Sequence, residues 1–330
     1  MPGRWSSAVG SLLVVGLLLA SLLLALVRVT DPGAQRLVEL AALSPLGLPI
    51  AGLALLGAAA WWTVPRRARV AAALAATGLL AVHAWWLAPL YVGPRPAGGP
   101  TSLVVLAQNF EYGDPAAVVR LVGRENVDVL VLTDAGTARA EELLAAGIEA
   151  QLPWSAGIGK EGAVVLSRVP VARAESLYAQ SESQLIELVV PGLGNVTLAA
   201  LHTAPPYRPE DWRTDHDRIR AALAGIRARS DAVVVLAGDL NATLAHAPVQ
   251  RLLELGFADA AVQANSGWSP TWPSGGHEER FGLTVPAFAA IDHVLTSPRL
   301  VVTRSETVDL AGADHLGVLA TISAAVPDAG

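Results

Sequence analysis

The sequence predicts an α/β domain that follows a membrane segment of three helices. Two observations lead to this prediction. The first hundred residues contain three long uncharged apolar runs, whereas from Thr101 onward short apolar strands alternate with amphipathic helical segments. Hydrophobic residues make up 52% of the chain, and their excess is concentrated in the first hundred residues. We therefore treat the two parts separately.

The three apolar runs cover about residues 8–27, 40–64 and 70–92. Each run has about 20 residues or more, which is enough to span a bilayer. A cleaved signal peptide is the alternative for the first run, but that run is longer than such a segment and no clear cleavage site follows it. His83 lies inside the third run, and we expect it to bond a neighbouring helix rather than a ligand.

The orientation in the membrane follows from the arginines between the second and third runs. Arg66, Arg67 and Arg69 form the densest basic cluster of this region, and such clusters stay in the cytoplasm. Three spans then place everything after Val92 outside the cytoplasm. We expect a multi-pass cell-membrane protein with a membrane domain over 1–93, a Gly- and Pro-rich linker over 94–100 and an extracytoplasmic domain over 101–325.

The domain from Thr101 alternates strands with helices. Short runs rich in β-branched and other apolar residues predict strands at 103–107, 127–132, 163–166, 186–190, 196–201, 233–237, within 287–295 and at 318–322. Amphipathic spacing predicts helices at 115–124, 138–146, 211–229 and 249–255. Residues 265–285 are rich in Gly, Pro and Trp, and we expect a surface loop there.

One stretch carries the clearest chemical signal. The buried strand around 233–237 runs through Gly238 into Asp239, and Asn241 follows two positions later. Side chains at i and i+2 of an extended chain share a face, so a carboxylate and a carboxamide project together from a rigid strand. The alternative is a plain Asx-turn, in which both side chains bond only the nearby backbone.

Other strands also end in residues able to bind a metal or transfer a proton, and this pattern favours a site. Strand ends that meet at one rim of a sheet form a site. The residues are Asn109, Asp134, His202, Asp239, Asn241, Asp292, Asp314 and His315.

These residue types suit hydrolysis at phosphorus. Asn109, Asp134 and Asp314 offer hard oxygen ligands, which suit Mg²⁺ or Mn²⁺. The chain has no cysteine, which excludes thiolate zinc sites and disulfides. We expect Asp292 to orient His315. We expect Asp239 to activate water, and Asn241 and His202 to donate to oxygens on which charge builds.

The charge of the domain argues against general nucleic-acid binding. From Thr101 onward the chain has 16 basic and 27 acidic residues, a net charge of −11. Such a surface does not bind phosphate backbones non-specifically, although a nuclease with a local basic rim stays possible. Among the other histidines, His293 should face away from Asp292 as a structural residue, whereas His216, His246 and His277 lie in polar surroundings and should be solvated.

From Leu103 to Ile322 the chain resembles the endonuclease/exonuclease/phosphatase superfamily of metal-dependent phosphoesterases. The order and spacing of eight short pieces carry the resemblance. These pieces are Gln108-Asn109, Val131-Leu132-Thr133-Asp134, residues 162–168, Leu201-His202-Thr203, Gly238-Asp239-Leu240-Asn241, Pro270-Thr271-Trp272, Ile291-Asp292-His293 and Asp314-His315.

The resemblance implies a four-layer α/β sandwich of two mixed β-sheets flanked by helices. It also implies that Asn109, Asp134 and Asp314 lie near the metal and that the remaining candidates surround the scissile phosphate. The chain departs from the family pattern at Asp134, where Glu is usual, and at Ala313, where Ser is usual. Neither change removes an ionisable group, so we expect activity.

Membrane spans ahead of such a domain are similar to a bacterial branch that includes teicoplanin-resistance proteins, which implies lipid-linked phosphate substrates. We therefore predict a membrane-anchored phosphoesterase that uses metal-activated water on a phosphate ester or pyrophosphate. The alternatives are an extracytoplasmic nuclease, which makes nucleic acid a less favoured partner, and a catalytically silent phosphate-binding domain. No protein partner is predicted.

Overall fold

The structure is a computed structural model that describes residues 2–61, 64–95, 97–159, 162–177, 183–229, 232–280 and 282–326. The chain divides into two compact units. One comprises residues 1–89 with 245–247, and the other comprises 90–244 with 248–330. Each unit is described by itself.

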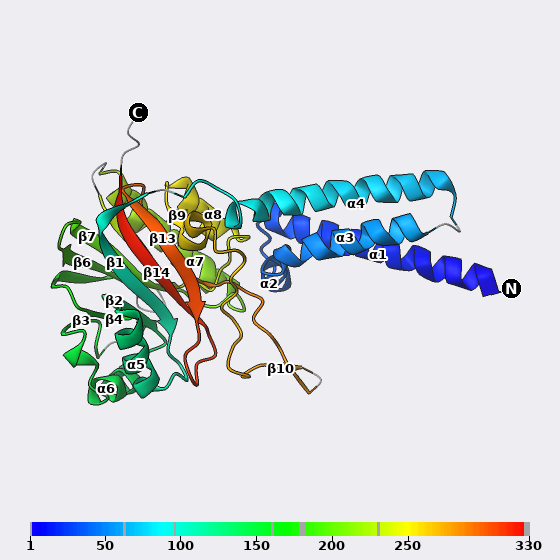
Figure 1. Cartoon of the computed structure of the whole chain (residues 1–330). Helices are drawn as coiled ribbons and strands as arrows, with labels where there is room; N and C mark the ends of the chain where they lie inside the picture. Colours follow the sequence, from blue (N-terminus) through cyan, green and yellow to red (C-terminus); the bar gives the residue numbers. More distant parts are fainter. Residues whose placement is uncertain are drawn as a thin grey trace. The chain divides into compact units, whose positions relative to one another are not determined.

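The amino-terminal unit is helical (Figure 1). Its elements are α1 (Pro2–Thr30), α2 (Gln35–Ala41), the 3₁₀ turn η1 (Ser44–Leu46), α3 (Gly47–Ala60) and α4 (Arg66–Leu87), and the 3₁₀ turn η2 (Ala88–Leu90) follows. Among the described residues, two stretches are long and apolar enough to cross a membrane, Ala8–Thr30 and Arg66–Leu90. They correspond to the first and third predicted spans.

The predicted second span, 40–64, does not form one continuous helix. Within it α3 has 14 residues, fewer than the roughly 20 that cross a bilayer. It is bent by 59° from α2, so a third span exists only if this bent pair is counted as one. Pro45 lies at the break, and proline removes a helical hydrogen bond and clashes with the preceding turn. Three membrane-spanning helices are therefore not established.

Close backbone contacts join the helices of this unit. The Ser21 hydroxyl donates to the Gly47 carbonyl over 3.2 Å, and His83 Nε2 lies 3.2 Å from the Ser21 carbonyl oxygen. A Cβ atom at Gly47 would lie 2.1 Å from the His83 ring, so only glycine fits there. His83 thus bonds a neighbouring helix, as predicted.

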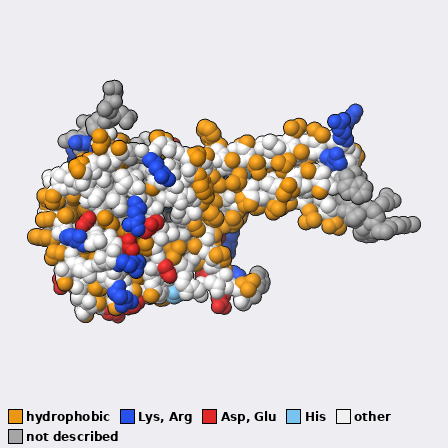
Figure 2. All heavy atoms as spheres, in the orientation of Figure 1, with side chains coloured by type: hydrophobic (Ala, Val, Ile, Leu, Met, Phe, Trp, Pro, Cys, Tyr) orange, Lys and Arg blue, Asp and Glu red, His pale blue; other side chains and the backbone are white. Residues whose placement is uncertain are grey.

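Apolar side chains cover the outside of these helices. Leu12, Leu56 and Leu74 each expose about two thirds of their surface or more (73%, 68% and 69%). Figure 2 shows apolar side chains along the length of the helical unit. Apolar exposure of this extent marks a surface that contacts lipid or protein rather than water alone.

The second unit contains two six-stranded sheets. The first sheet has the order β13-β14-β1-β2-β4-β3 and the second β5-β6-β7-β8-β12-β9. The strands of the first are β1 (Gly98–Asn109), β2 (Val129–Thr133), β3 (Trp154–Ala156), β4 (Val164–Ser167), β13 (Leu300–Val308) and β14 (Gly317–Ala325). Those of the second are β5 (Val171–Leu177), β6 (Ser183–Val190), β7 (Gly194–His202), β8 (Val234–Asp239), β9 (Ala258–Asp259) and β12 (Asp292–Thr296).

Both sheets are mixed, because β1 pairs in parallel with β2 and β7 with β8, whereas the other pairs are antiparallel. The helices of this unit are α5 (Pro115–Glu125), α6 (Thr137–Ala145), α7 (Pro209–Arg227), α8 (Ala247–Glu254) and α9 (Ala260–Ala264). A two-stranded hairpin, β10 (Glu279–Arg280) and β11 (Leu283–Thr284), projects from the segment predicted as a loop (Figure 1).

The main core lies between the two sheets. Val105 and Val131 of the first sheet share one buried cluster with Val235 of the second. Their strand neighbours Leu106 and Leu130 point the other way, because side chains alternate along a strand. These leucines pack in a second cluster with residues of α5 and α6. The arrangement confirms the predicted pair of mixed sheets flanked by helices.

The elements that the sequence pattern missed are mostly short or at sheet edges. They are β3, β5, β9, β13, α9 and the β10–β11 hairpin. In β5 the side chains of Arg173 and Glu175 are exposed, so the strand lacks the apolar run that identifies a buried strand. β1 is also longer than predicted, since it begins at Gly98 within the expected linker.

Candidate active site

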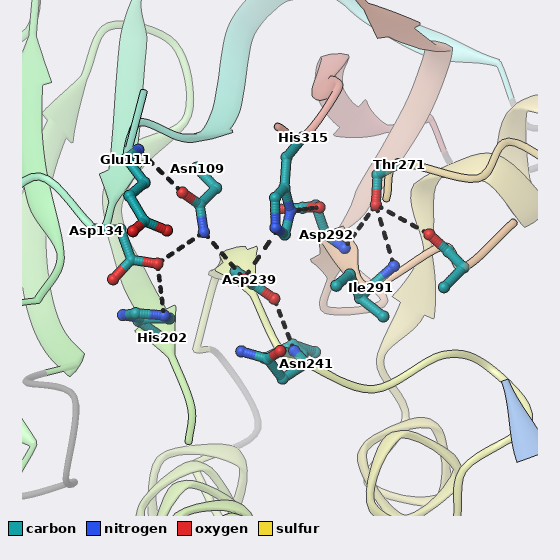
Figure 3. Close-up of polar contacts among 12 residues, drawn as sticks. Asn109, Glu111, Asp134, His202, Asp239, Asn241, Thr271, Ile291, Asp292 and His315 are labelled. Atoms are coloured by element: carbon teal, nitrogen blue, oxygen red, sulfur yellow. Dashed lines mark hydrogen bonds and ion pairs between the residues drawn. The ribbon is translucent and has the colours of Figure 1, made fainter. Parts of the chain in front are cut away.

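The predicted site residues meet at one edge of the stacked sheets. β1 and β2 run in parallel and end at this edge, and the antiparallel β14 begins there. In the second sheet β7 and β8 end at the same rim at which β12 begins. The pairing places Asp239 directly between His202 and Asp292. The sheet topology therefore brings residues far apart in sequence together (Figure 3).

The segment Gly238–Asn241 has a backbone that few residues tolerate. Gly238 has φ +138°, and a Cβ there would lie 2.0 Å from the Leu201 carbonyl oxygen. Asn241 has φ 45°, a left-handed conformation that Asn adopts more readily than most residues. Its N–H donates to Asp239 Oδ1 over 2.7 Å, and its side-chain amide donates to the Thr203 carbonyl over 2.9 Å. The Asx-turn considered as an alternative is therefore present, and it lies inside the cluster.

Asp292 and His315 form a buried pair. His315 Nδ1 lies 2.8 Å from Asp292 Oδ2 and 4.0 Å from Asp239 Oδ2. Burial favours the neutral ring, but the nearby carboxylates, Asp292 foremost, outweigh it and raise the pKa of His315 to about 10. His315 is therefore an imidazolium at neutral pH and is a hydrogen-bond donor and cation rather than a base.

Asp239 is a buried carboxylate whose pKa is raised toward neutrality. Burial, followed by the charge of Asp292, raises its pKa to about 6, while the positive charges of His315 and His202 act in the opposite direction. A carboxylate with such a pKa is ionised at pH 7 and still accepts a proton readily.

Asn109 connects the two sheets at this edge. Its side-chain amide donates to Asp134 Oδ2 over 2.9 Å and to Asp239 Oδ2 over 3.2 Å, and its oxygen accepts from the Glu111 N–H over 3.2 Å. His202 Nε2 lies 3.4 Å from Asp134 Oδ2. Asp134 has φ 49°, so it turns out of its strand toward this group. Figure 3 shows this bridge of side chains.

The chemistry of the donors fits a hard divalent cation. Asp314 Oδ1 and Asp292 Oδ1 are buried carboxylate oxygens with no hydrogen-bond partner among the described residues. A cation would satisfy such oxygens, and oxygen ligands suit Mg²⁺ or Mn²⁺. Asp314 lies close enough to His315 for its charge to contribute to the raised pKa of that ring.

Two features of the geometry bear on which atoms would bind the ion. Asp239, Asp292 and His315 each offer an atom within 4.8 Å of the others, but a protonated imidazole bonded to Asp292 is not a ligand. Asn109 presents its amide nitrogen, not its oxygen, to the carboxylates. For Asn109 to be a ligand, its amide would have to turn over. Asp134 and Asp314 need no such change.

Two residues of the cluster were not among the predicted site residues. Glu111 follows Asn109 by two positions, and its side chain lies beside Asp134 in Figure 3. The Thr271 hydroxyl accepts hydrogen bonds from the N–H groups of Ile291 and Asp292 over 3.1 and 3.3 Å. The sequence contains a signal for each. Glu111 is a carboxylate two positions after the predicted ligand Asn109, and Thr271 belongs to Pro270-Thr271-Trp272, one of the pieces that carry the family resemblance.

The remaining histidines differ from expectation in two cases. His216 and His246 were predicted to be solvated but are each only 5% exposed. His277 is exposed, as predicted. His293 is buried and lies 2.9 Å from Asp259 Oδ2, which agrees with the structural role predicted for it.

Comparison with known proteins gives a family match and a shared fold. Residues 106–320 match the Endonuclease/Exonuclease/phosphatase family. A search of curated proteins gives no significant match. Among solved structures, an endonuclease/exonuclease/phosphatase from Beutenbergia cavernae is 22% identical with a TM-score of 0.50, and the match covers 68% of this chain and 72% of that one.

Two further structures cover nearly all of their own length. A family protein from Bacteroides thetaiotaomicron is 13% identical with a TM-score of 0.56, and the match covers 69% of this chain and 100% of that one. TDP2 from D. rerio, complexed with a single-strand DNA product, is 15% identical with a TM-score of 0.53, and the match covers 68% of this chain and 99% of that one. At these identities the likeness concerns the fold.

Proposed function

Because the chain belongs to the endonuclease/exonuclease/phosphatase family, a family of hydrolases, we propose that it is a divalent-metal-dependent phosphoesterase anchored in a membrane. The observation that carries the proposal is the position of the His315 ring, whose Nδ1 lies 2.8 Å from Asp292 Oδ2 and 4.0 Å from the Asp239 carboxylate. An acidic donor and a basic acceptor side by side are what hydrolysis of a phosphate ester or pyrophosphate requires.

Asp239 is assigned the role of base. Its carboxylate is fixed at the end of β8 and accepts hydrogen bonds from the Asn241 N–H and the Asn109 amide. Its pKa, raised by burial to about 6, matches the task of orienting a water and taking its proton near neutral pH. Direct attack by this water needs no covalent intermediate.

His315, Asn241 and His202 are assigned to the oxygens on which charge builds. The His315 imidazolium is held by Asp292, so it offers positive charge in a fixed position. One N–H of the Asn241 amide is bonded to Thr203, which leaves the second for a ligand. Donors fixed before the reaction stabilise developing charge without further reorganisation.

Asp134 and Asp314, with Asn109 if its amide turns, would hold the cation. When bound, Mg²⁺ or Mn²⁺ would polarise the phosphoryl group and neutralise part of its charge. Asp134 is one carbon shorter than the Glu usual at this place, so it reaches less far. The nearby Glu111 keeps the local negative charge high.

A lipid-linked phosphate is the proposed substrate class. Two observations support it: the apolar stretches Ala8–Thr30 and Arg66–Leu90, which suit a bilayer, and the net charge of −11 from Thr101 onward. A tethered enzyme meets its substrate in the plane of the membrane, whereas the acidic domain repels free nucleic acid.

The proposed location is outside the cytoplasm. The basic cluster Arg66, Arg67 and Arg69 begins α4, and a cytoplasmic position for it puts the other end of α4 on the outer side. This argument depends on α4 alone. It therefore holds whether the bent α2–α3 pair crosses the membrane or not.

A substrate comparison tests the proposal. Purified full-length protein with Mg²⁺ would be incubated with an isoprenyl pyrophosphate and, separately, with supercoiled plasmid DNA. Phosphate release without nicking supports the proposal, and nicking without phosphate release supports the nuclease. Asp239→Ala and His315→Ala should each abolish turnover, whereas Glu141→Gln on an exposed face of α6 should not. A wild-type protein that binds phosphate but turns over neither substrate would be a binding domain.

A further inference from the structure

Buried side chains hold the turn that follows β8 through its carbonyl groups. Three of its carbonyl groups, those of Leu240, Asn241 and Ala242, each accept a hydrogen bond from a buried side chain. His216 Nε2 lies 3.0 Å from Leu240 O, which also accepts from the Thr203 hydroxyl over 2.6 Å. Trp212 Nε1 donates to Asn241 O over 3.0 Å, and His293 Nε2 lies 2.9 Å from Ala242 O. We call Trp212, His216 and His293 the turn clamp.

The members of the clamp come from two elements and are almost completely buried. Trp212 and His216 lie one turn apart on α7, and their rings pack edge to face with their centroids 5.0 Å apart. They are 1% and 5% exposed, and His293 on β12 is 4% exposed. Because a carbonyl only accepts, each ring nitrogen that contacts one must carry a proton. The clamp therefore has a defined protonation pattern.

His293 is anchored on its other side as well. Its Nδ1 lies 2.9 Å from Asp259 Oδ2, and Asp259 Oδ1 accepts from the Ala261 N–H at the start of α9 over 2.9 Å. Both ring nitrogens of His293 thus face acceptors, which requires the doubly protonated ring. The charge of Asp259 agrees with this, since it helps to raise the pKa of His293 against the effect of burial. A chain of bonds runs from α9 to the turn.

We propose that Trp212, His216 and His293 are positioning residues, which fix the turn 239–242 and thereby place Asp239 and Asn241 for catalysis. This inference rests on the proposed function. His293 follows Asp292 on β12, so its side chain points to the opposite face of the sheet. The clamp thus acts on the reacting groups through the backbone only.

The turn needs such support because of its shape. Asn241 adopts the left-handed conformation, and Gly238 lies in a region open only to glycine. The Asn241 amide hydrogen is bonded to Asp239 Oδ1 and the Leu240 amide hydrogen to Ile291 O. When a carbonyl loses its donor, this part of the chain relaxes and the Asp239 carboxylate moves with it. A displacement of about 1 Å lowers a rate by up to 10²-fold.

The test compares clamp variants of the full-length protein. Trp212→Phe removes the N–H and keeps a six-membered aromatic ring. His293→Leu removes the donor to Ala242, and it is made together with Asp259→Asn so that no unpaired buried charge remains. His293→Gln in the same Asp259→Asn background restores a donor. The control is Ser297→Ala, which removes the hydroxyl that accepts from the Val234 N–H at the far end of β8.

Two readouts separate positioning from plain stability. We expect Trp212→Phe and the His293→Leu pair to lower kcat at least tenfold with KM within threefold, and His293→Gln to recover most of the loss. Hydrogen exchange followed by mass spectrometry should show at least tenfold faster exchange in a peptide covering 239–243. Ser297→Ala should lower the unfolding temperature without either effect.

The outcomes are distinguishable. Unchanged exchange at 239–243 in both clamp variants overturns the proposal, and so does a kcat that falls no further than in Ser297→Ala. If the wild-type protein turns over no phosphate substrate, the proposed function fails, and the exchange measurement alone then decides whether the clamp holds the turn.

Discussion

His315 Nδ1 lies 2.8 Å from Asp292 Oδ2, although the two residues adjoin strands of different sheets. Asp292 begins β12 of the second sheet, whereas His315 leads into β14 of the first. Their bond therefore forms only when the sheets are stacked in the observed register. The pair is the clearest link between this fold and its chemistry.

Loss of the Asp292 charge should disable His315. Asp292→Asn keeps the size of the side chain but removes the carboxylate that fixes the imidazolium. We expect kcat to fall by about 10²-fold or more. Steady-state kinetics with the substrate found active would measure it, and circular dichroism would show that the fold is retained. A rate within fivefold of wild type would remove Asp292 from the mechanism.

The pH dependence of activity should have two limbs. Asp239 must be ionised to act as a base, so activity falls as pH drops below its pKa of about 6. His315 must be protonated, so activity falls again above its pKa of about 10. A bound cation favours the Asp239 carboxylate and shifts the acid limb lower. In Asp292→Asn the alkaline limb should move to lower pH, and an unmoved limb would assign it to another group.

Asp239→Asn should stabilise the metal-free protein while abolishing turnover. Folding raises the pKa of Asp239 from 3.8 to about 6. Protonation of Asp239 therefore stabilises the folded state, fully below about pH 4, and this stabilisation is lost as pH rises through 6. Above that pH the ionised Asp239 lowers the free energy of unfolding by up to about 3 kcal/mol relative to the protonated form. In EDTA at pH 8 the variant should melt higher, by about 2–4 °C per kcal/mol. At pH 4 the two proteins should melt alike, and a lower melting temperature at pH 8 would contradict the assignment.

Metal binding should depend on Asp134 and Asp314. Each Asp→Asn change removes a charged oxygen ligand, and we expect the Kd for Mn²⁺ to rise about tenfold or more. Titration calorimetry on the full-length protein measures this without any turnover. Glu141→Gln, an equal change of charge on an exposed part of α6, serves as the control. Equal affinities in all of these proteins would place the ion elsewhere.

The topology can be tested with a reporter fused after Ala329. Alkaline phosphatase is active only outside the cytoplasm, and we expect activity because Arg66, Arg67 and Arg69 hold the start of α4 inside. Replacing these three arginines by Gln should lower reporter activity by giving mixed orientations. A signal from a reporter that is active only in the cytoplasm would reverse the proposed location.

The sequence predicts the central strands and their polar ends well, for a physical reason. Val129–Thr133 and Val234–Asp239 are buried on both faces, so they read as continuous apolar runs that stop where the chain meets the site. Edge strands such as β13 escape detection, because charged residues such as Arg304 and Glu306 interrupt their pattern.

Other features depend on tertiary contacts. Thr271 lies in a segment without regular periodicity, so its bonds to the start of β12 are visible only in three dimensions. Hydropathy does not predict the bend between α2 and α3, because it depends on the number of apolar residues and not on helical hydrogen bonds. The polar surroundings of His216 in the sequence predict a solvated side chain, whereas Trp212, Ile219 and Leu223 at helical spacing place it on the buried face of α7.

The Asn109 amide contacts one carboxylate from each sheet, Asp134 and Asp239. Sliding of one sheet past the other would break one of these contacts, so Asn109 resists shear at the mouth of the site. Aliphatic packing deeper in the sandwich has no comparable directionality. The relative position of the two carboxylates is thus set when the protein folds, and it is kept for as long as the Asn109 amide holds this orientation.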